Sequence, residues 1–352
     1  MSGIERDLFG TTADGRAVAR FTLTNGSGTR LRLTTLGATA TELWVRDHRG
    51  HLEDVILGFA DVAGYETNTP YFGCTTGRVA NRISGGRLVV DGRTYQLPIN
   101  APPSLHLHGG VVGLNKRHWE AAAAGRGDEP AVRFSYLSPD GEEGYPGNLK
   151  LAVTYALTGA DGMRIEYEAT ADQATPVNLT NHCYFNLAGH GAGPIHDHRL
   201  QIHAARYTAM DADHVPLGPL APVAGTPLDF RQPHAVGERL GQVDGGYDHN
   251  YVLDHGPCAA PALSAEVRDP ASGRRMEVHT TEPGVQLYTA NMLATTRGKG
   301  GVTYGPHGAL CLETQHYPDS VNRPEFPSII LRPGATYRQV TEYRFAAGQP
   351  AA

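Results

Sequence analysis

Residues 148–170 read N-L-K-L-A-V-T-Y-A-L-T-G-A-D-G-M-R-I-E-Y-E-A-T, and this stretch decides which fold class the chain is expected to adopt. Apolar and polar side chains alternate along 148–157 and again along 163–170, which is the period of a strand with one buried face. The intervening T-G-A-D-G is rich in residues that favour turns. The stretch therefore predicts two neighbouring strands joined by a turn.

The same alternation recurs along most of the chain, between short segments rich in Gly, Asp, Asn and Pro. It marks R-F-T-L-T-N, T-R-L-R-L-T-T-L, T-E-L-W-V-R-D, G-R-L-V-V-D-G-R-T-Y-Q-L, A-V-R-F-S-Y-L, R-M-E-V-H-T-T and T-Y-R-Q-V-T-E-Y-R-F. Helical periodicity is nearly absent, and only 61–66 and 235–240 are expected to form a turn or two of helix. The pattern predicts an all-β fold, a large antiparallel β-sandwich, rather than βαβ units.

Charge and cysteine content limit the function classes. A net charge of -6 and a pI near 6.3, with no basic run, argue against nucleic acid or an anionic membrane as a partner. The four scattered cysteines lack a C-x-x-C pair, so free thiols in a reducing compartment are expected. The first residues lack a signal-peptide pattern, and no apolar run approaches the ~20 residues that span a bilayer. These features predict a soluble cytoplasmic protein.

One segment places a histidine among hydrogen-bonding groups. In T-P-V-N-L-T-N-H-C-Y-F-N-L, residues 175–187, an extended chain would alternate its side chains between two faces. One face would then carry a polar row: Asn178, Thr180, His182, Tyr184 and Asn186. That row predicts either a solvated face or the floor of a polar pocket.

Three more segments concentrate arginine, histidine and glycine. G-R-V-A-N-R-I brings together Arg78, Asn81 and Arg82, whose spacing alone favours a structural loop with surface arginines over a ligand site. S-L-H-L-H-G-G has an H-x-H pair, but its first following acid is Glu120, so the metal signal is weak; its glycines indicate close backbone approach. H-D-H at 196–198 is expected to be a solvated loop.

Polar side chains on other expected strands complete a possible site. Asp248, Gln286 and Glu313 each have an ordinary interpretation as outward side chains. Together with His182, and with the Asn and Arg residues above, they suit the binding of hydroxyl groups, with one imidazole and one carboxylate that could serve as acid and base. No G-x-S-x-G, H-E-x-x-H, Walker or dinucleotide motif occurs. Glycoside hydrolysis, which needs two acids, stays open through Glu313 with Asp248 or Asp319.

Seven motifs in order resemble the aldose 1-epimerase (galactose mutarotase) family over nearly the whole chain. They are G-R-V-A-N-R-I, L-H-G-G, S-P-D-G-E-E-G-Y-P-G, Q-A-T-P-V-N-L-T-N-H-x-Y-F-N-L, D-H-N, P-G-V-Q-L-Y-T and C-L-E-T-Q-x-x-P-D-x-x-N. The resemblance implies one large antiparallel β-sandwich domain over residues 1–352. It also implies interconversion of the α and β anomers of a free aldohexose such as galactose or glucose, with no metal and no cofactor.

The resemblance also assigns roles, one motif at a time. His182 corresponds to the general acid toward the ring oxygen O5, and Glu313 to the general base that takes the proton from the C1 hydroxyl. Five residues correspond to groups that contact the sugar: Asn81, Arg82, His108, Asp248 and Gln286. A Glu313 of ordinary pKa, about 4.3, would be ionised at neutral pH, so His182 is expected to start protonated beside a carboxylate.

The chain departs from the family pattern at two places, and two other functions stay open. Gly113-Leu114 stands where many relatives carry an aromatic residue, which could alter the pocket wall, and Cys183 occupies a variable small position. A sugar-binding module without turnover is one alternative. A relative acting on phosphorylated sugars is the other, although only Arg78 and Arg82 would serve it. The expected partner is a small-molecule monosaccharide, with no nucleic acid and no membrane, and the expected state is a monomer or homodimer.

Overall fold

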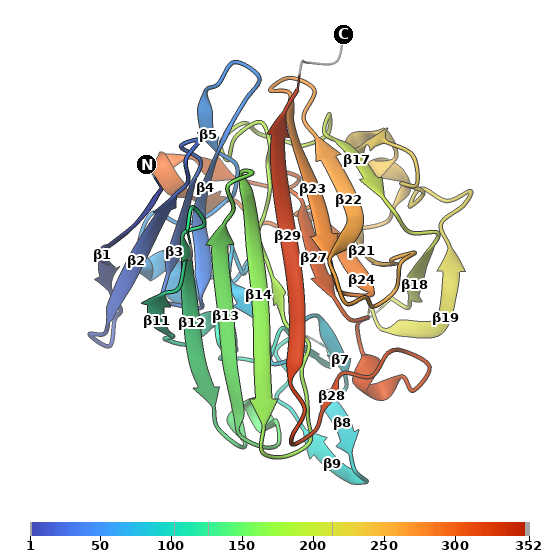
Figure 1. Cartoon of the computed structure of the whole chain (residues 1–352). Coiled ribbons are helices and arrows are strands. Elements are labelled where there is room, and N and C mark those ends of the chain that lie inside the picture. The colour runs from blue at the N-terminus through green and yellow to red at the C-terminus, as the bar shows by residue number, and fades with distance from the viewer. Residues whose placement is uncertain (1, 102, 126, 213, 349–352) are drawn as a thin grey trace.

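The computed structural model describes residues 2–101, 103–125, 127–212 and 214–348, and strands dominate this part of the chain (Figure 1). Its helices are short. The six-residue helix α1 (Val62–Thr67) begins at Asp61, whose side chain accepts a hydrogen bond from the Gly64 N–H. The 3-10 turns are η1 (Leu114–Lys116), η2 (Glu142–Gly144), η3 (Val236–Glu238), η4 (Leu240–Gln242), η5 (Lys299–Gly301) and η6 (Ser320–Asn322). The helical turns predicted at 61–66 and 235–240 are therefore confirmed.

Most strands belong to three sheets. The N-terminal sheet has the order β1 (Gly3–Thr11), β2 (Ala17–Thr24), β3 (Arg30–Thr34), β4 (Thr39–Arg46) and β5 (Leu52–Asp54). The large sheet has the order β11 (Glu120–Ala123), β12 (Ala131–Ser138), β13 (Leu149–Leu157), β14 (Gly162–Ala171), β29 (Tyr337–Ala347), β23 (Arg274–Thr280), β22 (Ala262–Arg268), β17 (Arg199–Ile202) and β20 (His234–Ala235). The third sheet has the order β19 (Pro216–Pro222), β18 (Arg206–Met210), β21 (Asp248–Val252), β24 (Gly284–Tyr288) and β27 (Cys311–Gln315).

Short strand pairs connect these sheets. They are β7 (Arg82–Ser84) with β10 (Leu105–Leu107), β6 (Thr75–Thr76) with β16 (Thr180–Asn181), β8 (Arg87–Val90) with β9 (Arg93–Gln96), β15 (Thr175–Pro176) with β28 (Ile330–Leu331), and β25 (Thr296–Arg297) with β26 (Thr303–Tyr304). The two strands predicted from residues 148–170 pair antiparallel as β13 and β14, with Leu157 opposite Met163.

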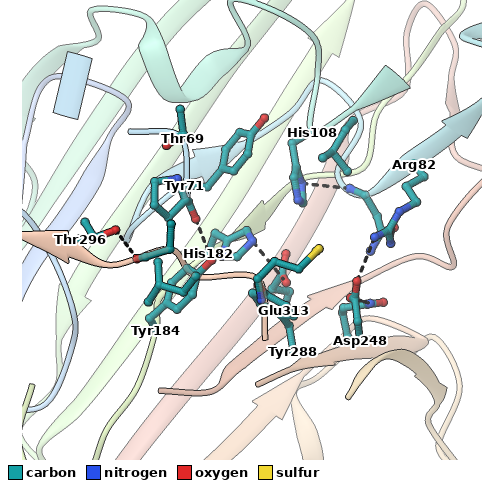
Figure 2. Close-up of a pocket in the computed structure, with 17 residues that line it drawn as sticks. Thr69, Tyr71, Arg82, His108, His182, Tyr184, Asp248, Tyr288, Thr296 and Glu313 are labelled. Carbon is teal, nitrogen blue, oxygen red and sulfur yellow. Dashed lines mark hydrogen bonds and ion pairs between the residues drawn. The ribbon is translucent and has the colours of Figure 1, made fainter. Parts of the chain in front are cut away.

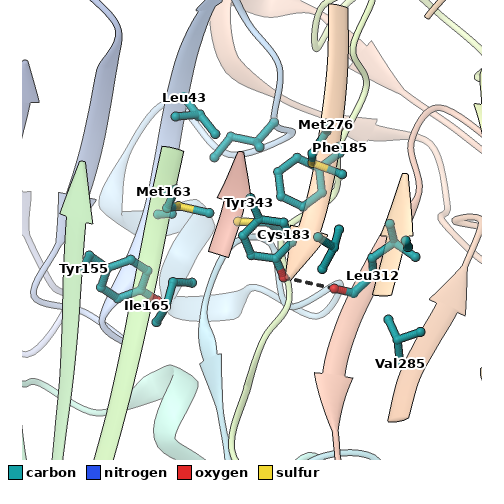
Figure 3. Packing of buried hydrophobic residues seen from close by; sticks show 14 of the residues in the cluster. Leu43, Tyr155, Met163, Ile165, Cys183, Phe185, Met276, Val285, Leu312 and Tyr343 are labelled. Carbon is teal, nitrogen blue, oxygen red and sulfur yellow. Dashed lines mark hydrogen bonds between the residues drawn. The ribbon is translucent and has the colours of Figure 1, made fainter. Parts of the chain in front are cut away.

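The large sheet packs face to face on the third sheet (Figure 3). Met163 and Ile165 of β14, Met276 of β23 and Tyr343 of β29 meet Leu312 of β27 in one buried hydrophobic cluster. Tyr343 Oη donates a hydrogen bond of 3.0 Å to the Leu312 carbonyl. On the other side of Glu313, Gln339 Nε2 donates one of 3.1 Å to the Thr314 carbonyl. The predicted antiparallel β-sandwich is confirmed, and β29 supports the strand that carries Glu313.

The segment 175–187 differs from the single strand that its alternation suggests. It forms only β15, β16 and isolated bridges at Asn178 and Phe185, because its partners come from different parts of the fold. Every residue in it is buried, so the polar row is not a solvated face. None of the helices in the described part of the chain is long and apolar enough to cross a membrane. All four cysteines are free thiols.

Candidate active site

A pocket of about 300 Å³ opens beside the third sheet, and it brings together all seven residues singled out by the sequence (Figure 2). Its lining includes Asn81, Arg82, His108, His182, Asp248, Gln286 and Glu313. They come from six separate segments of the chain. The pocket therefore exists only in the assembled fold.

Strand register explains why three of these side chains converge. Gln286 in the central strand β24 lies opposite Asn250 of β21 on one side and Glu313 of β27 on the other. Asp248 is two residues before Asn250, so it points to the same face of the sheet. Side chains on one face of adjacent strands are close neighbours. The row delivers two carboxylates and an amide to one wall of the pocket.

Asp248 is the fixed anion of this wall. Arg82 Nη2 contacts Asp248 Oδ2 at 2.9 Å, and Gln286 Nε2 donates a 2.6 Å hydrogen bond to Oδ1. Burial alone would raise the pKa of Asp248, but the charge and hydrogen bond of Arg82, with that of Gln286, outweigh it and lower the pKa. Asp248 is therefore a carboxylate near neutral pH, with one partner on each oxygen and further lone pairs free to accept from a ligand.

His182 and Glu313 face each other across the pocket floor. Their Nε2 and Oε1 atoms are 3.6 Å apart, too far for a direct hydrogen bond. Among the described residues, Glu313 Oε2 has no hydrogen-bond partner, although the side chain is buried. On the other ring nitrogen of His182, Cys311 Sγ lies 3.6 Å from Nδ1. Both groups line the pocket, so a hydroxyl placed beside them can reach the imidazole and the carboxylate.

Burial controls the protonation of this pair. It lowers the pKa of His182 to about 4, against weaker raising effects of its own backbone and Asp248. Burial, with the like charge of Asp248, raises the pKa of Glu313 well above its usual value, with only Arg82 opposing. The expectation of an ordinary pKa for Glu313 beside a protonated His182 is therefore wrong. The lowered pKa favours a neutral His182 near neutral pH, and the raised pKa favours the protonated form of Glu313.

His108 is held as a hydrogen-bond donor. Its Nδ1 accepts the Asn81 backbone N–H at 3.2 Å, and burial keeps its pKa well below the usual value. The neutral ring then carries its hydrogen on Nε2. The following Gly109 has a φ of +87°, and a Cβ there would lie 1.7 Å from the Gly77 carbonyl oxygen. The close backbone approach predicted for these glycines is confirmed.

His108, His182 and Glu313 are also the described residues best placed to hold a metal ion, with donor atoms within 4.8 Å of one another. A metal on His108 Nε2 would require the hydrogen to move to Nδ1, which would break the bond from Asn81. The tautomer that the fold selects is thus suited to a hydroxyl oxygen rather than to a cation.

Several other sequence candidates lie outside the pocket. Arg78 is buried, not on the surface, and its guanidinium donates to carbonyl oxygens of residues 138, 139, 146 and 147. His106 bonds the Pro98 carbonyl and Tyr145. His198, expected in a solvated loop, is buried because its Nε2 accepts the Leu187 N–H. Asp319 binds Ser84 through both carboxylate oxygens. It is therefore unsuited to pair with Glu313 as a hydrolase would require.

Gly113-Leu114 also lies away from the pocket. Leu114 is buried in the main hydrophobic cluster, and neither residue is part of the pocket lining. The expectation that this departure alters the pocket wall is wrong. Three tyrosines also line the pocket: Tyr71, Tyr184 and Tyr288. Tyr184 stands in the polar row that was expected as a possible pocket floor, whereas nothing local in the sequence marks Tyr71.

A family profile described as aldose 1-epimerase matches residues 19–344 of the chain. The chain belongs to this family. Galactose mutarotase of Rattus norvegicus is 46% identical over 98% of this chain and 99% of its own length. Aldose 1-epimerase of Escherichia coli (strain K12) is 36% identical over 95% and 97%. As an aldose 1-epimerase, the protein is an isomerase that interconverts the α and β anomers of aldoses.

Solved structures agree with this placement. Galactose 1-epimerase from Lactobacillus acidophilus superposes with a TM-score of 0.85 at 26% identity, covering 98% of this chain and 99% of that one. An aldose epimerase homologue from C. elegans superposes with a TM-score of 0.84 at 30% identity, with the same coverage. Both the family resemblance and the sandwich fold expected of this epimerase are confirmed.

Proposed function

We propose that Glu313 and His182 catalyse the anomerisation of free aldohexoses, galactose and glucose among them, by opening and closing the sugar ring. Glu313 takes the proton of the C1 hydroxyl, the electrons of that O–H bond form the C1 carbonyl, and the C1–O5 bond breaks. His182 gives its proton to O5. After rotation about C1–C2, O5 adds to the other face of C1, and both protons return. The cycle consumes no reagent, so it needs no cofactor and no metal.

The observation that carries this proposal is the facing pair itself: a buried imidazole and a buried carboxyl group 3.6 Å apart, the pKa of the first lowered and that of the second raised, so that one proton on the pair is favoured. Ring opening needs one acid and one base at the same time, and one proton on two groups supplies both. Sugar binding must move that proton from Glu313 to His182. A hydroxyl that donates to Glu313 favours the carboxylate, and O5, an acceptor, favours the imidazolium.

The remaining polar groups bind the sugar hydroxyls and so orient C1 and O5 toward Glu313 and His182. Asp248 and Arg82 form a fixed ion pair that offers acceptors and donors side by side, as vicinal hydroxyls require. His108 offers an N–H, and Asn81 and Gln286 offer amides; Gln286 Oε1 has no other partner among the described residues. Arg82 is the one lysine or arginine among the described lining residues, which disfavours a phosphorylated substrate.

Polarimetry of the wild-type protein tests the function. Freshly dissolved α-D-galactose and α-D-glucose should reach their equilibrium rotation faster in proportion to enzyme concentration, after subtraction of the spontaneous rate. Methyl α-D-galactopyranoside, which has no C1 hydroxyl, should inhibit without itself changing rotation. A protein that binds these sugars and leaves the rate at its spontaneous value is a binding module, and the proposal fails.

The pH profile of kcat/KM tests the protonation of the pair, because this parameter reports the free enzyme. Below a pH of about 4, His182 gains a proton while Glu313 keeps its own, so no base remains and activity falls. Toward alkaline pH, activity falls only when Glu313 loses its proton, which its raised pKa delays. In polarimetric assays we expect activity to be maintained as the pH falls from neutral toward 5, because the pKa of His182 is about 4. A fall as the pH drops through the ordinary histidine value, about 6.5, would contradict the assignment.

We further propose that residues 1–352 form one domain, acting in the cytoplasm as a monomer or homodimer. One hydrophobic cluster joins Phe21 near the N-terminus to Phe345, which supports a single domain. Every group proposed for catalysis comes from one chain, which is consistent with an active monomer. Free thiols at all four cysteines fit a reducing compartment.

A further inference from the structure

His182 is stacked between two tyrosine rings. The ring centroid of Tyr184 lies 5.1 Å from that of His182 with an interplanar angle of 18°, and that of Tyr71 lies 5.9 Å away at 19°. Figure 2 places the two tyrosines on either side of the imidazole. Tyr184 also donates a 2.8 Å hydrogen bond to the Pro70 carbonyl, which fixes the residue directly before Tyr71. Tyr184 thus stacks on His182 and also fixes, through Pro70, the backbone that carries Tyr71.

Tyr71 reaches His182 from a backbone conformation that tyrosine rarely adopts. Its φ is +63°, in the left-handed region that bulky residues rarely adopt. Tyr71 also contacts His108, with ring centroids 4.7 Å apart. The strained backbone therefore presents the ring to the two pocket histidines.

We propose that Tyr71 and Tyr184 are positioning residues that stabilise the imidazolium of His182 during the reaction. This inference rests on the proposed function, in which His182 must hold a proton next to O5. The face of an aromatic ring is negative and attracts a cation within about 6 Å of its centroid, most strongly where water is excluded. Both tyrosine centroids meet that distance. The sandwich offsets part of the burial that otherwise keeps His182 neutral.

The other groups facing His182 do not replace this effect. The titratable and charged groups around the imidazole are Glu313, Asp248, His108, Cys311, Tyr71 and Tyr184. Glu313 attracts the imidazolium only after its own proton has moved, and Asp248, paired with Arg82, raises the pKa of His182 only weakly against burial. His108 meets His182 at 71°, and as a neutral N–H donor it offers no negative charge. The two rings add to the weak raising effects of Asp248 and of the His182 backbone, and they face the imidazole without needing to change their own protonation.

Replacing Tyr71 by leucine tests the proposal, because it removes the aromatic face and keeps an apolar side chain. We expect kcat to fall about three- to tenfold with KM changed less than twofold, since a weaker imidazolium is less populated but a stronger acid, which recovers part of the loss. The acid limb of the pH profile should move to lower pH by up to about 1 pH unit. Tyr71→Phe, which keeps the ring, should stay within about twofold of wild type.

Tyr71→Gly is the second ring-less variant, since glycine adopts this φ without strain and guards against misfolding of the leucine variant. NMR titration of labelled His182 measures the imidazolium directly, so it reports on the sandwich even if the catalytic roles prove otherwise. In ring-less variants the His182 pKa should be lower than in wild type. An unchanged pKa overturns the proposal. So does a rise in KM alone, or a loss in Tyr71→Phe equal to that in Tyr71→Leu, either of which makes Tyr71 a sugar contact.

Discussion

Replacing Glu313 by glutamine is expected to lower kcat for α-D-galactose anomerisation by about 10²- to 10⁴-fold. Glutamine has nearly the same size, and its carbonyl oxygen still accepts a hydrogen bond from the C1 hydroxyl. The amide has no atom basic enough to remove that proton, and it has no carboxyl proton to pass to His182. KM should change little, because the hydroxyl contacts of Arg82 and Asp248 are untouched. Polarimetry at pH 7, with the spontaneous rate subtracted, measures the loss.

Glu282→Gln is the matched control. Glu282 is also buried, and its carboxylate contacts His316, but it does not line the pocket. This change should lower the thermal midpoint and leave kcat within about twofold of wild type. Undiminished activity of Glu313→Gln would remove Glu313 as the base. A similar loss in both variants would mean that kcat reports on the integrity of the sheet rather than on proton transfer.

Replacing His182 by asparagine is expected to lower kcat by about 10²-fold or more, because the amide cannot protonate O5. The double variant with Glu313→Gln should be little worse than the poorer single variant, since an acid without its base does not open the ring. Burst-free polarimetric progress curves of the wild-type, single and double variants give the comparison. Losses that multiply would show that the two groups act independently, against the shared-proton mechanism.

His198→Asn serves as the control for this series. His198 is buried, and burial lowers its pKa to about 4, as for His182, but it bonds the Leu187 backbone away from the pocket. Its replacement should destabilise the fold and leave the turnover of the remaining folded protein near wild type. His182 and His198 are both buried, but only His182 lines the pocket. Comparing kcat of the two asparagine variants therefore separates the loss of proton transfer from the loss of a buried histidine.

Local sequence periodicity was enough for the long strands and for part of the site, but not for residues 175–187, which alternate without forming one strand. The alternation in residues 148–170 predicted β13 and β14, and the polar row around His182 pointed to a pocket. What periodicity cannot show is which strands become neighbours. Glu313 was paired with His182 only through the family resemblance, because the register of β24 and β27 that brings Glu313 to the pocket is a property of the whole sheet.

Protonation and ring stacking were beyond the sequence for a related reason. An ordinary pKa for Glu313 assumes water around the carboxylate, and only the three-dimensional packing reveals that both members of the pair are desolvated. Tyr71 has no sequence signal, because it reaches His182 through a backbone conformation that tyrosine seldom adopts. Arg78 was expected on the surface but is buried. Its guanidinium donates hydrogen bonds to backbone carbonyls, and no pattern of side chains in the sequence marks such partners.

The position of β29 has a consequence for biosynthesis. This strand follows every other described strand in the chain, yet it lies in the interior of the large sheet between β14 and β23, and it bonds the carbonyls on both sides of Glu313. While the ribosome still holds residues 337–347, β14 and β23 have no common neighbour, and the base rests on nothing. We therefore expect the nascent chain to stay inactive until this strand has left the ribosome and paired between β14 and β23, and a chain truncated before residue 337 to be inactive although it contains every proposed site residue.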